Sequence, residues 1–186
     1  MFQDFKKYKN IFFLGIGGVG MSALARWCYS KNFNIMGYDK NMSVLSSGLE
    51  SMGIKIIYKP SLENIPNNFL DNSTTLVVYT PAINDENIFF DFFTKNNFVV
   101  FKRAKLLGQI CLDYNVIAIA GTHGKTTVSI MLSHILTVAG YDPSAFFGGI
   151  SNNYQSNVLL GKSDYMIVEA DAVSYTHLTL PTICSV

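Results

Sequence analysis

The chain has 186 residues, 49% of them hydrophobic, and carries 14 basic and 13 acidic side chains for a formal net charge of +1. This composition excludes a disordered chain, and it lacks the basic tracts that are typical of nucleic-acid-binding proteins. Glycines interrupt the apolar stretches within about a dozen residues, too few to cross a bilayer, and polar residues 1–10 do not resemble a signal peptide. We therefore expect a cytoplasmic protein with neither a nucleic-acid nor a membrane partner.

The first predicted strand, residues 11–14, leads into the glycine-rich segment Gly15-Ile16-Gly17-Gly18-Val19-Gly20. This segment fits the pattern G-x-G-x-x-G and opens a predicted helix whose shared face carries Met21, Leu24, Ala25 and Cys28. Asp39 ends the next strand, residues 35–38, where an acidic group would contact a ribose hydroxyl. The pattern is typical of dinucleotide binding, but any nucleoside diphosphate derivative would satisfy it. Close packing of helix on strand, without a ligand, is the alternative.

Strands and helices then alternate along the chain. We expect a helix over 44–52, a strand over 54–58, a surface segment over 60–73, and a strand over 75–79 with a turn at 80–82. A helix capped by Asn84 and ending at Asn96, a strand over 98–101 and a helix over 103–112 follow. The alternation predicts parallel sheets covered by helices, with ligand sites at the carboxyl ends of strands. We place a domain boundary near residue 105, which gives domains 1–105 and 106–171.

A second glycine loop follows the strand predicted at 116–120. It consists of Gly121, Thr122, His123, Gly124, Lys125, Thr126 and Thr127. The Gly-Lys-Thr order is typical of a loop that holds nucleotide phosphates, although the spacing is shorter than the standard pattern. The next helix has apolar residues at i, i+3, i+4 and i+7, with Gly140 at its expected end. These apolar positions are Val128, Met131, Leu132 and Ile135. An ordinary strand–turn–helix joint with a surface lysine is the alternative.

The last informative segment is Tyr165–Asp171, an apolar strand that ends in acidic residues. Glu169 lies 44 positions after Lys125. A carboxylate at the end of a neighbouring strand can hold Mg²⁺ beside a phosphate loop. An exposed strand end explains this residue equally well. The cysteines, Cys28, Cys111 and Cys184, are isolated and odd in number, so we interpret them as reduced thiols.

Taken together, the segments 15–25, 121–127 and 168–171 closely resemble the Mur ligase family, and the stretches 79–83 and 103–104 agree with it. The resemblance covers residues 8 to about 171, and the shortened phosphate loop is the family's own form. It implies an α/β fold in which a Rossmann-like, parallel-sheet UDP-binding domain precedes a phosphate-loop ATP-binding domain, truncated here.

The resemblance implies an amide-forming ligase of peptidoglycan precursor synthesis, in which ATP phosphorylates the carboxylate of UDP-N-acetylmuramate and the amine of L-alanine then attacks. It assigns Gly15, Gly17, Gly18, Val19, Gly20, Asp39 and Thr80 to the UDP substrate. It assigns Gly121 to Thr127 to ATP, with Lys125 as the catalytic residue. Thr126 and Glu169 would hold Mg²⁺. We assign His123 no proton-transfer role.

The sequence also departs from the family. Its members have three domains and more than twice this length, so we expect an N-terminal fragment that is inactive alone. Residues 172–186 match nothing in the family, and we interpret them as a non-native tail. Three alternatives stay open: the related ligase that attaches a recycled tripeptide to the same UDP sugar, an NAD-dependent oxidoreductase, and a non-catalytic nucleotide-binding module.

Overall fold

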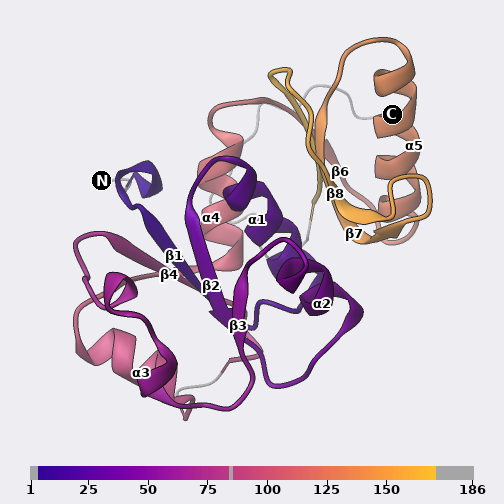
Figure 1. Ribbon diagram of the computed structural model, residues 1–186. Helices are drawn as coiled ribbons and strands as arrows, with labels where there is room; N and C mark the ends of the chain where they lie inside the picture. Colours follow the sequence, from indigo (N-terminus) through magenta and orange to yellow (C-terminus); the bar gives the residue numbers. More distant parts are fainter. Residues whose placement is uncertain (1–3, 84–85, 171–186) are drawn as a thin grey trace.

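The computed structural model describes residues 4–83 and 86–170, which form two sheets with helices between and around them (Figure 1). The first sheet has five parallel strands in the order β3-β2-β1-β4-β5. The strands are β1 (Asn10–Leu14), β2 (Asn34–Tyr38), β3 (Lys55–Ile57), β4 (Thr75–Tyr79) and β5 (Val99–Lys102). The expected parallel α/β fold is confirmed for this part of the chain.

Helices cover both faces of the first sheet. Ile11 and Phe13 of β1 lie in the cluster that includes α1 (Val19–Ser30) and α4 (Arg103–Cys111). Phe12, on the opposite face of β1, contacts Phe89 and Phe93 of α3 (Ile88–Lys95). The short helix α2 (Val44–Glu50) packs beside α1. Burial on both faces explains why these strands read as continuous apolar runs instead of alternating ones.

The start of α3 corrects the expected cap. Asn84 lies outside the described residues, and the helix begins only at Ile88. Asn87 is its N-cap, and the side-chain oxygen of Asn87 accepts from the amides of Phe89 and Phe90 at 3.0 and 3.2 Å. Two asparagines close together in sequence can each cap a helix, so the pattern alone did not select the right one.

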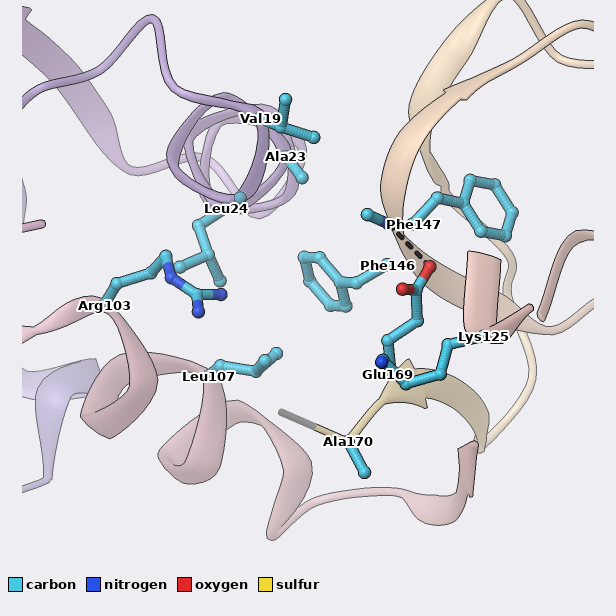
Figure 2. A pocket seen from close by; sticks show the side chains of 12 residues that line it. Val19, Ala23, Leu24, Arg103, Leu107, Lys125, Phe146, Phe147, Glu169 and Ala170 are labelled. Atoms are coloured by element: carbon cyan, nitrogen blue, oxygen red, sulfur yellow. Dashed lines mark hydrogen bonds between the residues drawn. The ribbon is translucent and has the colours of Figure 1, made fainter. Parts of the chain in front are cut away.

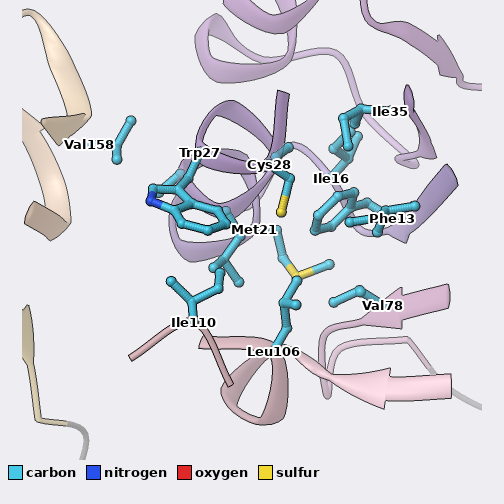
Figure 3. Close-up of a cluster of buried hydrophobic side chains, with 14 of the residues drawn as sticks. Phe13, Ile16, Met21, Trp27, Cys28, Ile35, Val78, Leu106, Ile110 and Val158 are labelled. Atoms are coloured by element: carbon cyan, nitrogen blue, oxygen red, sulfur yellow. The ribbon is translucent and has the colours of Figure 1, made fainter. Parts of the chain in front are cut away.

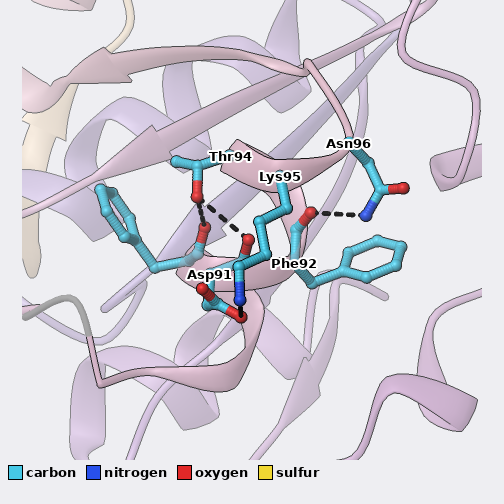
Figure 4. A network of polar contacts seen from close by, with 6 residues as sticks. Asp91, Phe92, Thr94, Lys95 and Asn96 are labelled. Atoms are coloured by element: carbon cyan, nitrogen blue, oxygen red, sulfur yellow. Dashed lines mark hydrogen bonds and ion pairs between the residues drawn. The ribbon is translucent and has the colours of Figure 1, made fainter.

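The end of α3 carries a local polar network on the surface (Figure 4). The ammonium of Lys95 pairs with the Asp91 carboxylate at 2.9 Å, one helical turn away. The amide of Asn96 donates to the carbonyl of Phe92 at 2.8 Å. Exposed pairs of this kind contribute less than about 1 kcal/mol, so this network adds little to the stability of the fold.

The second sheet has the order β6-β9-β7-β8. Its strands are β6 (Asn115–Ile119), β7 (Ser144–Ser151), β8 (Ser156–Leu159) and β9 (Tyr165–Glu169). β9 lies between β6 and β7 and is parallel to both, whereas β8 runs antiparallel to β7. β7 and β8 were not predicted from the sequence, because Gly148 and Gly149 interrupt the first of these strands and the second is short and polar at its start.

The helix after the phosphate loop, α5 (Lys125–Val138), is confirmed, but its buried side is only partly the expected one. Val128, Met131 and Ile135 are 49%, 59% and 59% exposed, whereas Ser129 and Ser133 are fully buried. Of the four expected apolar positions, Leu132 packs on the sheet, and it does so together with Ile130 and Leu136, which were not in the expected set. Gly140 follows the helix with φ +85°, as its predicted role as a cap requires.

The two sheets share α1 and one hydrophobic cluster. In Figure 3, Val158 of β8 faces Trp27 of α1, with α4 residues close by. The buried amide of Asn157 donates to the Val19 carbonyl at 2.6 Å and to the Ser22 hydroxyl at 2.8 Å, which joins β8 to the first turn of α1.

Each sheet with its helices forms one unit of the chain. The expected boundary near residue 105 falls inside α4, a helix that packs on β4, β5 and α1 and therefore belongs to the unit of the first sheet. We therefore propose a division between Cys111 and Asn115, where α4 has ended and β6 begins.

None of the helices in the described part of the chain is long and apolar enough to cross a membrane. Cys28 is buried and Cys111 partly buried, and both are free thiols. Burial raises the pKa of the Cys111 thiol to about 12 and that of Cys28 further. Cys184 and the tail at 172–186 lie outside the described residues, so the interpretation of that tail stays a prediction.

Candidate functional site

The first glycine loop joins β1 to α1 and borders a cavity of about 820 Å³. Gly15 has φ +84°, a conformation that side chains disfavour, and the amide of Gly18 donates to its carbonyl at 3.2 Å. Gly18 is the N-cap of α1 and has no side chain to occupy the helix amides. Such a free N-terminus favours an anion. The predicted residues that the structure brings together around this cavity are Gly15, Gly17, Gly18, Asp39 and Thr80.

Asp39 lines the cavity, but two backbone amides already donate to its carboxylate. Its Oδ2 accepts from the Gly17 amide at 2.7 Å, and its Oδ1 accepts from the Asn41 amide at 3.2 Å. The carboxylate therefore lies against an amide that the loop would offer to a diphosphate. A diphosphate and this carboxylate would compete for the same N–H, so binding through Gly17 requires the Asp39 side chain to turn away.

The second glycine loop joins β6 to α5. Gly121 has φ +147° and Gly124, the N-cap of α5, has φ +76°, so both positions favour glycine. The ammonium of Lys125 donates to the Gly121 carbonyl at 2.8 Å and so folds back over the loop. Thr122, His123 and Thr127 are exposed. The loop thus presents helix amides and a lysine on one surface, as a phosphate site needs.

Glu169, at the end of β9, lies next to the start of α5. Its Oε2 accepts from the Thr126 hydroxyl at 3.0 Å, and its Oε1 accepts from the Gly148 amide at 2.6 Å and the Ser129 hydroxyl at 3.1 Å. The predicted pair, Thr126 and Glu169, is therefore in direct contact. The strand-end position of Glu169 was predictable, but the role of the Gly148 amide was not, because β7 was not anticipated.

Hydroxyl and carboxylate oxygens are the donors that Mg²⁺ prefers, so this pair fits that ion. The described residues contain no group of three or more His, Cys, Asp or Glu side chains that could hold a metal. Mg²⁺ commonly binds to one or two protein oxygens, with phosphate oxygens and water completing its shell. The geometry therefore suits a Mg²⁺–nucleotide complex better than a resident metal.

A second cavity, of about 370 Å³, lies between the two units (Figure 2). Val19 and Gly20 line it from the first turn of α1, Lys125 lines it from the start of α5, and Glu169 lines it from the end of β9. Arg103, the first residue of α4, also borders this cavity. Val19 and Gly20 thus face this junction and not the larger cavity with the other predicted UDP residues. The two glycine loops consequently have a common space between them.

Comparison with known proteins shows which family the chain resembles. The model of the Mur ligase family, catalytic domain, matches residues 10–115. The UDP-N-acetylmuramate–L-alanine ligase of Porphyromonas gingivalis is 46% identical over 173 residues, which cover 91% of this chain and 38% of that enzyme. The chain thus spans well under half the length of this curated relative.

Two solved structures have a similar fold. The UDP-N-acetylmuramate–alanine ligase of Thermotoga maritima has a TM-score of 0.77 at 27% identity, with coverage of 86% of this chain and 37% of that one. A murein peptide ligase of Psychrobacter arcticus has a TM-score of 0.75 at 26% identity, with coverage of 87% and 37%. The family model covers more than half of the chain, and the relative from Porphyromonas gingivalis is matched over most of it. From this agreement of sequence and fold we conclude that the chain belongs to the Mur ligase family.

Proposed function

We propose that this chain is the nucleotide-binding part of an ATP-dependent ligase that joins L-alanine to the carboxylate of UDP-N-acetylmuramate in peptidoglycan precursor synthesis. The observation that carries the proposal is the cavity between the two units, because the first turn of α1 and the pair Lys125 and Glu169 all line it. A UDP sugar with its diphosphate at the first loop would extend its carboxylate toward the phosphate loop. The name of the relative that is 46% identical supports this choice of substrates.

The proposed reaction has two steps. A carboxylate oxygen of the sugar attacks the γ-phosphorus of ATP, the bond to ADP breaks, and an acyl phosphate forms. The amine of L-alanine then attacks the acyl carbon, phosphate leaves, and the nitrogen loses a proton. The protein contributes little covalent chemistry to these steps. It catalyses them by positioning the reactants and by stabilising charge.

Each predicted residue has a place in this scheme. The amides of the first loop, with Asp39 and Thr80 beside them, orient the UDP group, and the loop from Gly121 to Thr127 holds the phosphates of ATP. Lys125 stabilises the charge that develops on the outer phosphates. Thr126 and Glu169 would hold Mg²⁺, which neutralises phosphate charge when it is bound.

The proposal applies to the complete ligase. The relatives are more than twice as long as the matched segment, so we expect this chain to bind the two nucleotides but to need further domains for the alanine-dependent step. Since both nucleotide substrates are cytoplasmic compounds, we also place the reaction in the cytoplasm.

The related ligase for a recycled tripeptide is the second candidate, because a murein peptide ligase has a similar fold. In the comparison of solved structures its identity to this chain is 26%, next to 27% for the L-alanine ligase of Thermotoga maritima, so the preference rests on the curated relative that is 46% identical. In a full-length enzyme, measuring ADP release with L-alanine and with the tripeptide as the acceptor would distinguish the two candidate ligases.

Isothermal titration calorimetry on the chain, with UDP-N-acetylmuramate and NAD as separate ligands, tests the proposal. We expect binding of the UDP sugar and little or none of NAD. Tighter binding of NAD would support an oxidoreductase and contradict the ligase proposal. Titration with UDP alone then separates the contribution of the nucleotide from that of the sugar.

A further inference from the structure

The carboxylate of Glu169 is oriented by donors from two different elements. Its Oε1 accepts from the Gly148 amide of β7 and the Ser129 hydroxyl of α5, whereas its Oε2 accepts from the Thr126 hydroxyl. The two oxygens therefore have different surroundings. Oε1 is anchored by two donors, and Oε2 lies beside the hydroxyl proposed to bind Mg²⁺.

Ser129 is an unusual choice for this position of a helix. It is fully buried on the side of α5 that faces the sheet, where an apolar residue would be expected. Its hydroxyl also lies 3.0 Å from the Thr126 carbonyl, the usual partner of a serine within a helix. The contact with Glu169, across 40 positions in the sequence, is additional.

Ser133, one turn later, is a buried serine whose hydroxyl makes only the usual kind of contact within the helix among those that the structure gives. It is as fully buried as Ser129 and lies on the same side of α5. Its hydroxyl donates at 2.7 Å to the Ser129 carbonyl, and this is a contact within the helix. The two serines thus match in burial and helix position but differ in whether they reach the carboxylate.

Gly148 completes the arrangement by leaving room for it. A Cβ at this position would lie 2.6 Å from Oε2 of Glu169 and 3.0 Å from the Thr126 hydroxyl oxygen. Any side chain here would therefore displace the carboxylate. The backbone of β7 approaches closely enough for its amide to bind Oε1 only because Gly148 has no side chain.

We propose that Ser129 is a positioning residue for Mg²⁺–nucleotide binding, which anchors Oε1 of Glu169 so that Oε2 is presented beside Thr126. The inference rests on the proposed function, since it assumes that Thr126 and Glu169 meet the metal. Groups that orient a metal ligand typically change metal affinity by about 10–100-fold when removed. The proposal therefore predicts a specific defect in the metal-dependent part of nucleotide binding.

The test compares Ser129→Ala with the matched control Ser133→Ala in the whole chain. The dissociation constant of ADP is measured by calorimetry in EDTA and in Mg²⁺, and Mn²⁺ binding to the ADP complex is followed by electron paramagnetic resonance. For Ser129→Ala we expect unchanged ADP binding in EDTA and Mn²⁺ affinity lowered by about tenfold or more. For Ser133→Ala we expect no change in either measurement.

A double-mutant cycle with Glu169→Ala then tests whether Ser129 acts through that carboxylate. We expect Ser129→Ala to have no further effect on Mn²⁺ affinity when Glu169 is already alanine. An equal effect in both backgrounds would overturn the proposal. So would an equal loss of ADP binding with and without metal, because that pattern indicates a structural defect.

The result also separates this inference from the proposed function. If the unmodified chain binds ADP more tightly with Mg²⁺ and Ser129→Ala retains that gain, the inference alone is wrong. If the unmodified chain binds no ADP under either condition, the proposed ATP site fails and the inference fails with it.

Discussion

The amide of Gly17 donates to the Asp39 carboxylate at 2.7 Å, so the central glycine of the first loop and the acidic residue that ends β2 are already in contact. A Cβ on residue 17 would lie 2.9 Å from Oδ2 of Asp39. A methyl group on residue 17 and the Asp39 carboxylate in its present position therefore exclude each other.

Replacing Gly17 by alanine should weaken UDP-N-acetylmuramate binding by about tenfold or more, because the new Cβ blocks the backbone that an anion approaches. Calorimetry with the UDP sugar measures this change. The control is Gly149→Ala, where a Cβ meets only the Thr126 methyl group at an ordinary 3.6 Å. Unchanged affinity in Gly17→Ala would contradict a diphosphate site at this loop.

Lys125→Ala should reduce turnover of the full-length ligase on the order of 10²–10³-fold, the usual effect of losing one preorganised group that stabilises charge in the transition state. Turnover is followed by ADP release in a full-length enzyme that contains this segment. Lys95→Ala is the control, because Lys95 forms only an exposed pair with Asp91. Near-normal turnover of Lys125→Ala would show that the phosphate loop does not have the proposed role.

Thr126→Ala and Glu169→Gln should each raise the Mg²⁺ concentration needed for half-maximal nucleotide binding, because each change weakens or removes an oxygen donor for the metal. The measurement is a Mg²⁺ titration at fixed ATP, with Glu63→Gln, an exposed carboxylate elsewhere, as the control. If neither variant shifts the titration midpoint, the metal does not bind between these two side chains.

The stability of the chain should decrease at alkaline pH. Burial raises the pKa of the Cys111 thiol from 9.0 to about 12. Above pH 9 the unfolded thiol ionises while the folded one keeps its proton, so the free energy of unfolding falls as pH rises through this window. Urea titrations between pH 8 and about 10.5 measure the slope. The Cys111→Ala variant should show a shallower slope, and an identical slope would rule out this thiol as a cause.

The exposed apolar face of α5 should promote self-association of the chain. Val128, Met131, Ile135 and Val138 are between 49% and 74% exposed and lie at helical spacing. Contiguous apolar surface of this kind favours association. Light scattering against concentration should show less association for a Met131→Lys, Ile135→Lys double variant, with ADP binding unchanged. Equal scattering by both proteins would exclude this face as the cause.

Much of the fold was predictable because the strands of a parallel sheet have strong local signals. Ile11, Phe13 and Val78 belong to apolar runs that burial on two faces requires, and the glycines that end such runs mark the loops. Periodicity predicted the buried side of α5 only in part, since Leu132 packs on the sheet while Val128, Met131 and Ile135 are exposed. Val128 and Leu132 are equally apolar, and only the position of β7 and β9 decides which of them is covered.

The candidate site was predictable where one short segment contains its chemistry, as in the loop from Gly121 to Thr127. It was not predictable where contacts depend on register between strands. The Gly148 amide meets Glu169 because β7 pairs with β9 through Phe146 and Val168. Asn157 reaches the Val19 carbonyl across 138 positions, and nothing local distinguishes it from the many other asparagines of the chain.

The hydrophobic cluster that α1 shares between the sheets has a consequence for how the chain unfolds. Phe146 and Met166 of the second sheet pack in the same cluster as Met21 and Leu24 of α1. Separating the sheets would expose apolar surface on both, so opening at the junction and loss of each sheet are thermodynamically linked. The segment between Cys111 and Asn115 therefore separates two sheets that differ in topology, but we do not expect the two parts to unfold independently of each other.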